Sequence, residues 1–183
     1  MDEALLTLLA KKDLQYISVK EICEKAGVNR STFYLHYENI SDLLNEAVEY
    51  TLSEFSLKFE GIIDIKKEEL ESAPAEELLF ITPKYLIPYL EFMRENQCFF
   101  AVVVTRPSVL RVNDIFNKRY AEVYAPIMKR FGIGEKEGKY RLSFYLNGIF
   151  ALISEWIKGG CTEPPEQIAD FISSSILPKT LEP

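Results

Sequence analysis

Histidine is the scarcest chemically versatile residue in the sequence, which contains only His36. A Ser-His-Asp or Cys-His mechanism needs a histidine beside its nucleophile, and a multi-histidine metal site needs several. Cysteine is nearly as scarce, because Cys23, Cys98 and Cys161 lie far apart and lack the spacing of metal ligands. No arrangement of carboxylates, lysines or tyrosines stands out as catalytic. We therefore expect a protein that is not an enzyme and that holds no metal ion or cofactor.

Long hydrophobic runs are missing as well. The apolar run Phe99–Thr105 is short and ends at Arg106-Pro107, whereas a membrane-spanning helix needs about 20 apolar residues. The sequence begins Met1-Asp2-Glu3, although a secretory signal begins with basic residues. An odd number of scattered cysteines also favours reduced thiols over a disulfide framework. We expect neither membrane insertion nor export, and thus a cytoplasmic protein.

Positive charge is in the minority. The chain has 21 Lys and Arg against 28 Asp and Glu, which gives a net charge of −7 at pH 7. A protein that coats nucleic acid through bulk electrostatics needs the opposite balance, whereas a local binding face does not. Apolar residues make up 48% of the 183 residues and charged residues 27%. This composition is typical of a globular protein with one large domain or two small ones.

Helical periodicity, by contrast, is present almost throughout. Apolar residues recur at helical spacing in nearly every segment, and no segment shows the alternation of a β-strand, so the sequence predicts an all-α protein. The charged segment Lys66–Glu77 is expected to be a loop or a frayed helix end. Pro83, Pro88 and Pro126 should shorten or kink the helices that contain them. The expected helices cover about residues 4–13, 19–26, 29–36, 39–59, 77–97, 108–131, 137–158 and 165–177.

The clearest local motif runs from Ser18 to His36. Ser18 and Glu21 have the spacing of a capping box, so a helix should start at residue 19. Gly27 supplies the left-handed residue that ends this helix, and Asn29 can cap a further short helix that runs to about His36. Two short helices around a tight turn form a helix-turn-helix, whose second helix enters the major groove of DNA.

The second helix of this motif has two faces. Phe33 and Tyr37 are four residues apart and are expected to face the core, whereas Arg30 and Tyr34 share another face. Arg30 can make a bidentate contact with guanine. Alternatively, Tyr34 and Tyr37 could both be core aromatics, so the sequence does not decide which face carries Tyr34.

Several neighbouring residues could add contacts with DNA. Ser31 and Thr32 can bond bases or phosphates, and Leu35 can touch a thymine methyl group. Ser18 and Lys20 lie at the start of the preceding helix, where free amides and the positive end of the helix dipole favour a phosphate. The pattern thus predicts one helix that reads bases and another that holds the DNA backbone.

These residues resemble the head of TetR/AcrR-type transcriptional regulators. The resemblance rests on the order of residues 19–22, 26–28 and 31–37, followed by Asp42-Leu43-Leu44, and it covers about the first 45 residues. It implies an all-helical homodimer with a three-helix DNA-binding head at residues 1–45 and a larger helical body at 46–183 that binds a small effector. For His36 an alternative to contact with a DNA phosphate is a role as the cap of the third helix. The positions that match the family's DNA contacts are Ser18, Lys20, Arg30, Ser31, Thr32, Tyr34 and His36.

The remainder of the chain is rich in aromatic residues, most of which must belong to its core. Tyr85 and Tyr89 are four residues apart, as are Tyr120 and Tyr124, so each pair lies on one helical face. Buried tyrosine hydroxyls need partners, which suits a mixed pocket for an apolar or aromatic effector of the kind that the resemblance implies. The candidate ligand-binding residues are Tyr85, Tyr89, Phe92, Phe116, Tyr120, Tyr124 and Phe144.

The segment Tyr140–Lys158 has an unusually broad apolar face, on which Gly148 and Ala151 permit close approach. It is similar to the penultimate helix of the family, which pairs together with the last helix in a four-helix bundle between two subunits. A face too wide for one neighbouring helix also predicts a homodimer through residues 140–158 and 165–177. The candidate interface residues are Leu146, Ile149, Phe150, Ile153, Trp156, Ile157, Ile168, Phe171 and Ile172.

Together these features predict a sequence-specific DNA-binding transcriptional regulator. By resemblance it would be a homodimeric repressor that binds a palindromic operator in double-stranded DNA and is released by its effector. A second hypothesis is a protein-binding co-activator that has lost operator binding. Residues 1–45 hold five Lys and Arg against seven Asp and Glu, Asn39-Ile40 stand where many members have a lysine, and Met1-Asp2-Glu3 stand where the family has a basic arm. These three departures favour the second hypothesis more than is usual for the family, although the DNA-binding regulator remains the leading one.

Overall fold

A computed structural model describes residues 1–63, 82–107, 109 and 129–176. All regular structure in these residues is helical, which confirms the predicted all-α class. The chain forms two compact units, the first from residues 1–59 and 96–112 and the second from residues 60–95 and 113–183. Several predictions lie outside the described residues, namely the loop at 66–77, most of the helix at 108–131, Pro126 and the ligand candidates Phe116, Tyr120 and Tyr124.

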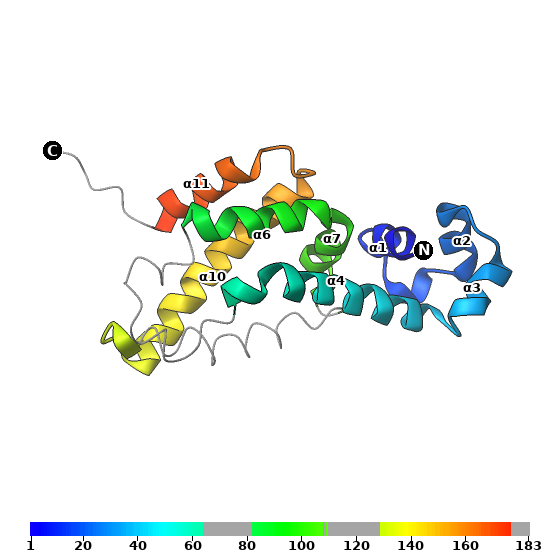
Figure 1. The fold of residues 1–183 in the computed structure, drawn as a ribbon, viewed down its shortest axis with the longest axis horizontal. Helices are drawn as coiled ribbons and strands as arrows, with labels where there is room; N and C mark the ends of the chain where they lie inside the picture. Colours follow the sequence, from blue (N-terminus) through cyan, green and yellow to red (C-terminus); the bar gives the residue numbers. More distant parts are fainter. Residues whose placement is uncertain (64–81, 108, 110–128, 177–183) are drawn as a thin grey trace. The chain divides into compact units, whose positions relative to one another are not determined.

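The first unit contains the predicted helix-turn-helix. α1 packs against α2 and α7, and α2 packs against α3, so the three short helices share one core with α7 (Figure 1). Leu5, Leu9, Ile22, Phe33 and Leu43 are fully buried in that core. The helices of this unit are α1 (Asp2–Leu9), η1 (Leu14–Tyr16), α2 (Val19–Ala26), α3 (Arg30–His36), α4 (Ile40–Ile63) as far as residue 59, and α7 (Gln97–Thr105).

The bounds of α2 follow from its predicted capping residues. The Ser18 hydroxyl oxygen accepts from the Glu21 amide at 3.3 Å, and the Glu21 carboxylate accepts from the Ser18 amide at 2.9 Å, which is the predicted capping box. Gly27 ends the helix with φ of 68°, a left-handed conformation that glycine adopts at little cost. Asn29 stands at the predicted cap of α3, but its side chain makes no capping hydrogen bond, and the helix begins without one.

The first helix is shorter than predicted. It ends at Leu9 and not near Asp13, because the amides of Lys11 and Lys12 both turn back to the Leu8 carbonyl and close the helical ladder. Asp13 is extended and leads into the single 3-10 turn of η1. The periodicity of apolar residues does not report such a change in hydrogen bonding.

The start of α4 is fixed by a second set of side-chain caps. The Asn39 side-chain oxygen accepts from the amides of Ser41 and Asp42 at 2.8 and 3.1 Å. The Asp42 carboxylate accepts from the amides of Glu38 and Asn39, each at 3.2 Å. The chain therefore turns sharply between α3 and α4, and α4 runs on as the predicted long helix.

Helix α7 was not predicted. Its sequence, QCFFAVVVT, is apolar on nearly all sides, so it carries no helical period that could be read. Phe99, Val102 and Val103 are buried, and the Thr7 hydroxyl lies 3.8 Å from the Cys98 sulfur. The helix is thus an inner element of the first unit and packs along α1.

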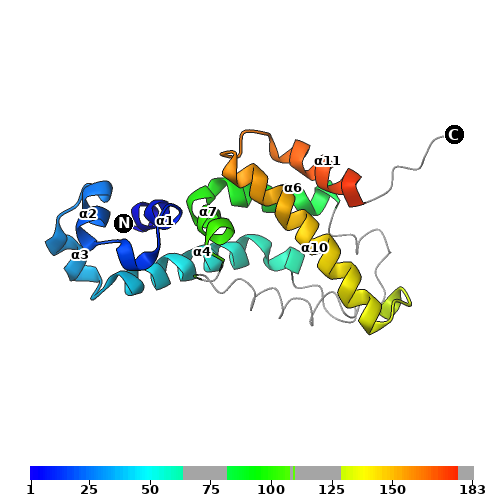
Figure 2. The same ribbon diagram turned by 180° about the vertical axis from the view of Figure 1, so that it is seen from behind.

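The second unit is built from α6 (Pro83–Glu95), α10 (Glu135–Lys158) and α11 (Pro165–Ile176). α11 packs against both α6 and α10, and both views show it beside them (Figure 1 and Figure 2). Proline 83 is the first residue of α6, a position where its missing amide costs nothing, and Pro88 lies inside the helix, which continues to Glu95. The core of this unit includes Leu86, Leu90, Trp156, Ile168 and Ile172.

Candidate nucleic-acid interface

Helix α3 presents its two faces as the sequence predicts. Phe33 is fully buried, whereas Tyr34 is 59% and Leu35 80% exposed. Arg30 and Ser31 are also exposed, and Thr32 is half-buried. An exposed arginine, hydroxyl, phenol and leucine on one short helix form a surface that can meet base edges and phosphates.

Tyr37 and Tyr34 have different roles in this helix. Tyr37 is half-buried, its ring centroid lies 5.5 Å from that of Phe33, and its hydroxyl donates to the Glu46 carboxylate at 2.9 Å. Burial and then that carboxylate raise the pKa of Tyr37 to about 12, so the phenol stays protonated. Tyr37 therefore fixes the end of α3 to α4, while Tyr34 remains at the surface and is not a core aromatic.

His36 is the last residue of α3 and is exposed. The alternative role as a helix cap is not what the structure shows, because the C-cap position is Tyr37, whose amide donates to the Phe33 carbonyl at 2.9 Å. The His36 ring centroid lies 6.1 Å from that of Tyr37. The imidazole nitrogens thus lie at the surface, near the junction of α3 and α4.

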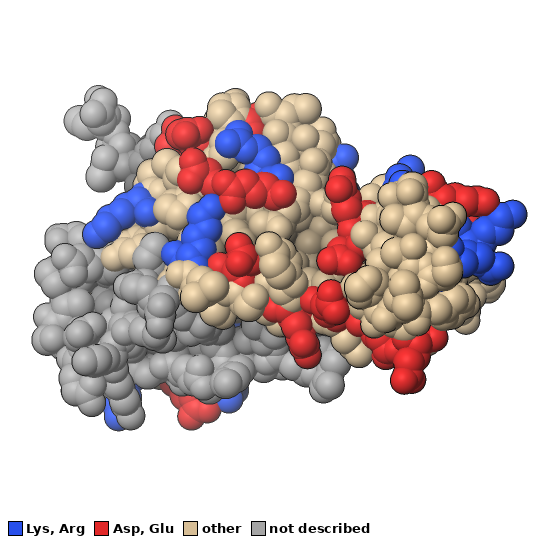
Figure 3. Space-filling view, turned by 45° about the vertical axis from the view of Figure 1, so that its right-hand side comes forward, with Lys and Arg blue, Asp and Glu red and all other residues tan. Residues whose placement is uncertain are grey.

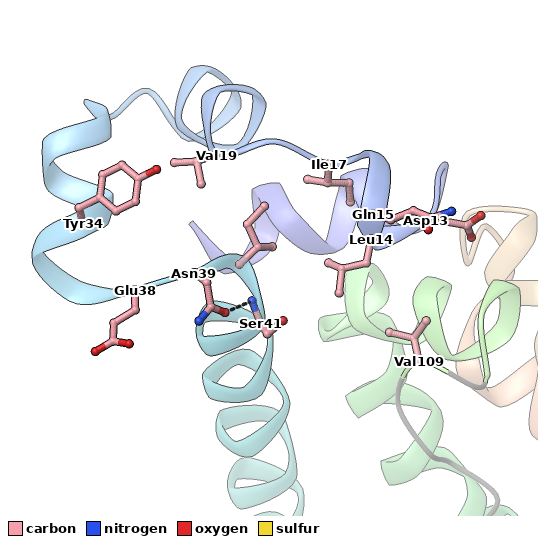
Figure 4. A pocket seen from close by; sticks show the side chains of 11 residues that line it. Asp13, Leu14, Gln15, Ile17, Val19, Tyr34, Glu38, Asn39, Ser41 and Val109 are labelled. Carbon is pink, nitrogen blue, oxygen red and sulfur yellow. Dashed lines mark hydrogen bonds between the residues drawn. The ribbon is translucent and has the colours of Figure 1, made fainter.

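A hollow of about 920 Å³ lies between η1, the start of α2, α3 and the start of α4. Tyr34 reaches from α3 toward Val19 at the start of α2, and Asn39 lies near the turn into α4 (Figure 4). Asp13 and Glu38 also line the hollow. Its wall thus combines a phenol, the first turn of a helix and two carboxylates.

The first turn of α2 has both engaged and unengaged donors. The Ser18 and Glu21 amides are used in the capping box, and the Ser18 hydroxyl donates to the Glu21 carboxylate at 2.9 Å. The amides of Val19 and Lys20 have no partner within the helix, as is usual for first-turn residues, and the helix dipole adds positive potential there. The Lys20 ammonium group is exposed and lies 3.7 Å from Glu24.

Charges of both signs lie on α2, where exposed Glu24 stands 3.7 Å from Lys20, and acidic side chains predominate along α4. Lys20 and Lys25 on α2 and Arg30 on α3 are exposed, and Figure 3 shows basic side chains at the end of the unit where these helices lie. Acidic residues follow the exposed side of α4, among them Glu46 and Glu49. Arg30 therefore offers an exposed positive charge to a polyanion on α3, whereas the carboxylates along α4 repel it.

The ligand candidates of the second unit are spread over two helices. Phe92 is buried on α6, Tyr85 and Tyr89 are half-buried on the same helix, and Phe144 on α10 is 77% exposed. Phe144 therefore does not lie in the interior of the unit. The effector-binding role of these residues stays a prediction.

The candidate interface residues fall into three groups by exposure. Trp156, Ile157, Ile168 and Ile172 are buried within the chain itself. Phe171 is exposed, and the other four candidates, Leu146, Ile149, Phe150 and Ile153, are half-buried.

The exposed face of α10 carries other residues. Tyr140, Phe144, Gly148 and Ala151 are all exposed and recur at helical spacing. The spacing of these four residues is visible in the sequence, but the sequence does not show which face of α10 is covered by α11. It therefore marks only Gly148 and Ala151, as small residues that permit close approach, and not the whole stripe as an interface.

The described part of the chain contains no group of three or more His, Cys, Asp or Glu that could hold a metal ion. Among the helices that the structure describes, none is long and apolar enough to cross a membrane.

Two family models match the chain. The model described as bacterial regulatory proteins, tetR family, matches residues 3–47, and the one described as transcriptional regulator C-terminal region matches residues 82–177. The uncharacterized HTH-type transcriptional regulator YxbF of Bacillus subtilis (strain 168) is 30% identical to the chain over 180 residues. That match covers 93% of this chain and 42% of the relative, so the chain spans less than half of the relative's length. Among solved structures, the dihydroxyacetone kinase operon activator DhaS is similar with a TM-score of 0.47 and 19% identity, over 96% of this chain and 90% of the other.

Proposed function

Because the chain belongs to the tetR family of bacterial regulatory proteins and is a transcriptional regulator, we propose that it is a homodimeric repressor that binds a palindromic operator and is released by a small effector. One observation carries the DNA-binding part of this proposal. Helix α3 exposes Arg30, Ser31, Tyr34 and Leu35 while Phe33 holds it to the core. A helix that is anchored on one side and polar on the other fits the major groove.

The DNA backbone would be held beside the reading face. A phosphate at the hollow can accept from the Val19 and Lys20 amides and from the Tyr34 hydroxyl, which Figure 4 shows reaching toward Val19. Lys20 and His36 are exposed and add further donors. Ser18 contributes differently, because its hydroxyl proton is already donated to Glu21. We propose that Ser18 acts by fixing the start of α2.

The second copy of the chain would bind α10 and α11. The exposed stripe of Tyr140, Phe144, Gly148 and Ala151 leaves aromatic surface in water on a single chain, and its small residues allow a second helix to approach closely. Phe171 on α11 is exposed as well. A twofold dimer through these helices carries two copies of α3, so it requires an operator with two half-sites.

Effector control and the direction of regulation are further parts of the proposal. Tyr85 and Tyr89 are half-buried on α6 and Phe92 is buried beside them, which suits an apolar or aromatic molecule with a polar group. The division into a head at 1–45 and a body at 46–183 belongs to the same proposal. A regulator that binds the bacterial chromosome acts in the cytoplasm, where we expect this protein.

A band-shift titration tests the proposal with the DNA that lies upstream of the protein's own coding region. We expect a retarded complex at fixed salt that resists competition by scrambled DNA, and a footprint with two symmetric half-sites. Equal competition by scrambled DNA, or no complex, would overturn operator binding. A co-activator without operator binding is not favoured, since the reading face of α3 is exposed and carries the expected donors.

A further inference from the structure

The turn between α1 and η1 is tied to two distant parts of the first unit. Lys12 and Asp13 are adjacent in this turn, and their side chains form ion pairs in different directions. Lys12 pairs with Glu21 in α2, and Asp13 pairs with Arg106 at the end of α7. The turn is therefore held between the helix-turn-helix and a segment more than 90 residues away in the sequence.

The tie to α2 ends on the residue that caps that helix. The Lys12 ammonium nitrogen lies 2.5 Å from one oxygen of the Glu21 carboxylate. The other oxygen accepts from the amide and the hydroxyl of Ser18, each at 2.9 Å. Lys12, and next Ser18, lower the pKa of Glu21 to about 2, so the carboxylate is ionised at neutral pH. Lys12 thus sets the orientation of the side chain that fixes where α2 begins.

Arg106, which follows the last residue of α7, contacts the last turn of α1 as well as Asp13. The Arg106 Nε donates to the Leu9 carbonyl at 2.7 Å, where an α-helix has carbonyls without partners of their own. The same guanidinium pairs with Asp13. Its cation also lies at the negative end of the α1 dipole. The Arg106 side chain is 23% exposed and that of Asp13 is 55% exposed, so solvent screens the ion pair more than the contact with Leu9.

These ties converge on the place where DNA would be held. The order Arg106, Asp13, Lys12, Glu21 and Ser18 leads from α7 to the first turn of α2, whose Val19 lines the hollow opposite Tyr34 (Figure 4). Arg106 and Asp13 do not lie on the reading face of α3. Because their charges are paired with each other, they are suited to holding the turn and not to reading bases.

We propose that Arg106 and Lys12 are positioning residues for DNA binding, which hold the α1–η1 turn so that the first turn of α2 meets the phosphate. The inference rests on the proposed function for its DNA part only. Arg106 would act through Leu9 and Asp13, and Lys12 through Glu21. The two residues belong to one path, so loss of either should disturb the same structure.

The test compares Arg106→Gln, Lys12→Gln and the double variant in the full chain. Each single variant should weaken operator binding by about 2- to 30-fold, the range seen when residues coupled to a site are changed. The double variant should be little weaker than the worse single variant, because both changes release one turn. Arg106→Lys keeps the charge and should recover part of the affinity. Fully additive losses, or unchanged binding by Arg106→Gln, would overturn the proposal.

Arg141→Gln is the matched control, since it removes the same charge and breaks an exposed pair with Glu137 on α10. It should bind operator as the parent does. Affinity that drops equally in this control would show that net charge alone explains the losses, and would contradict a positioning role.

A second readout needs no DNA. Hydrogen exchange of the Ser18 and Ile22 amides should become faster in Arg106→Gln, with amides of α10 unchanged, because the start of α2 loses its support. A uniform rise of the exchange rates over the whole chain, or unchanged rates at Ser18 and Ile22, would refute the positioning role. If the parent itself does not bind operator, the proposed function fails, and this exchange experiment alone decides between support and refutation of the inference.

Discussion

Phe33 and Tyr34 meet edge to face, with ring centroids 5.3 Å apart and planes at 83°, although one ring is buried and the other is mostly exposed. This arrangement is a favourable one for two aromatic rings. The core ring therefore restricts the exposed ring, and the Tyr34 hydroxyl is held toward the hollow before any DNA arrives. The pair of Phe33 and Tyr34 therefore contributes both to the core of the head and to the position of the Tyr34 hydroxyl group.

Arg30→Ala should weaken operator binding by about 1–3 kcal/mol and relax the preference at one base position, if its guanidinium makes a bidentate contact with guanine. The fold should be spared, because Arg30 is exposed at the first residue of α3. Titration against operator and against operators changed at single positions measures the effect. Arg141→Ala is the control for lost charge, and parent-like affinity of Arg30→Ala would contradict the assignment of α3 as the reading helix.

Tyr34→Phe removes only the hydroxyl group and keeps the ring that contacts Phe33. If that hydroxyl donates to a phosphate, operator and scrambled DNA should both bind more weakly and by a similar factor, because phosphates carry no base identity. Fluorescence titrations at fixed salt measure both affinities. Tyr50→Phe, which alters an exposed tyrosine on α4, should leave both unchanged. A loss confined to the operator would instead indicate that Tyr34 contacts a base.

The capping box of α2 should weaken in acid. The pKa of Glu21 is lowered to about 2 in the folded protein, below the ordinary value of about 4.3. A lowered pKa means that the stabilisation is fully present above the ordinary value and is lost as the pH falls toward 2. A carboxyl NMR titration should therefore show Glu21 ionised at pH 4, and Lys12→Gln should move its midpoint upward. An unchanged midpoint in that variant would show that Lys12 does not support the carboxylate.

Phe144→Glu should convert the proposed dimer to a folded monomer. Phe144 is 77% exposed on a single chain, so a charge there costs the isolated fold little but would be buried in the proposed interface. Sedimentation measures the mass, and circular dichroism follows the helices. Tyr16→Glu, at an exposed aromatic residue of η1, is the matched control and should remain dimeric. A parent that sediments as a stable monomer would refute the interface itself.

Local chemistry determines the bounds of some helices but not the presence of others. The start and end of α2 could be predicted, because Ser18, Glu21 and Gly27 act on backbone groups within a few residues of themselves. The exposed face of α3 could be predicted for the same reason, once Phe33 was assigned to the core. Helix α7 could not be predicted, since a run that is apolar on nearly all sides shows no helical period.

Contacts between residues far apart in the sequence could not be predicted from periodicity. Trp156 and Ile172 belong to the apolar faces that were predicted to bind a second chain, yet they are buried within their own chain. Periodicity marks a face as apolar without naming the neighbour that covers it. The pairing of Arg106 with Asp13 is of the same kind, because nothing in either residue's surroundings in the sequence points to the other.

The composition of the first unit has a consequence for how the protein is made. Residues 1–59 form one compact unit with α7, which packs along α1 and buries Phe99, Val102 and Val103. At a synthesis rate of about 5–20 residues per second, α7 follows α1 from the ribosome by about 5–20 seconds. During that interval the side of α1 that α7 covers has no cover, and the nascent head cannot complete its core. The DNA-reading surface is therefore finished only after more than half of the described chain has been translated.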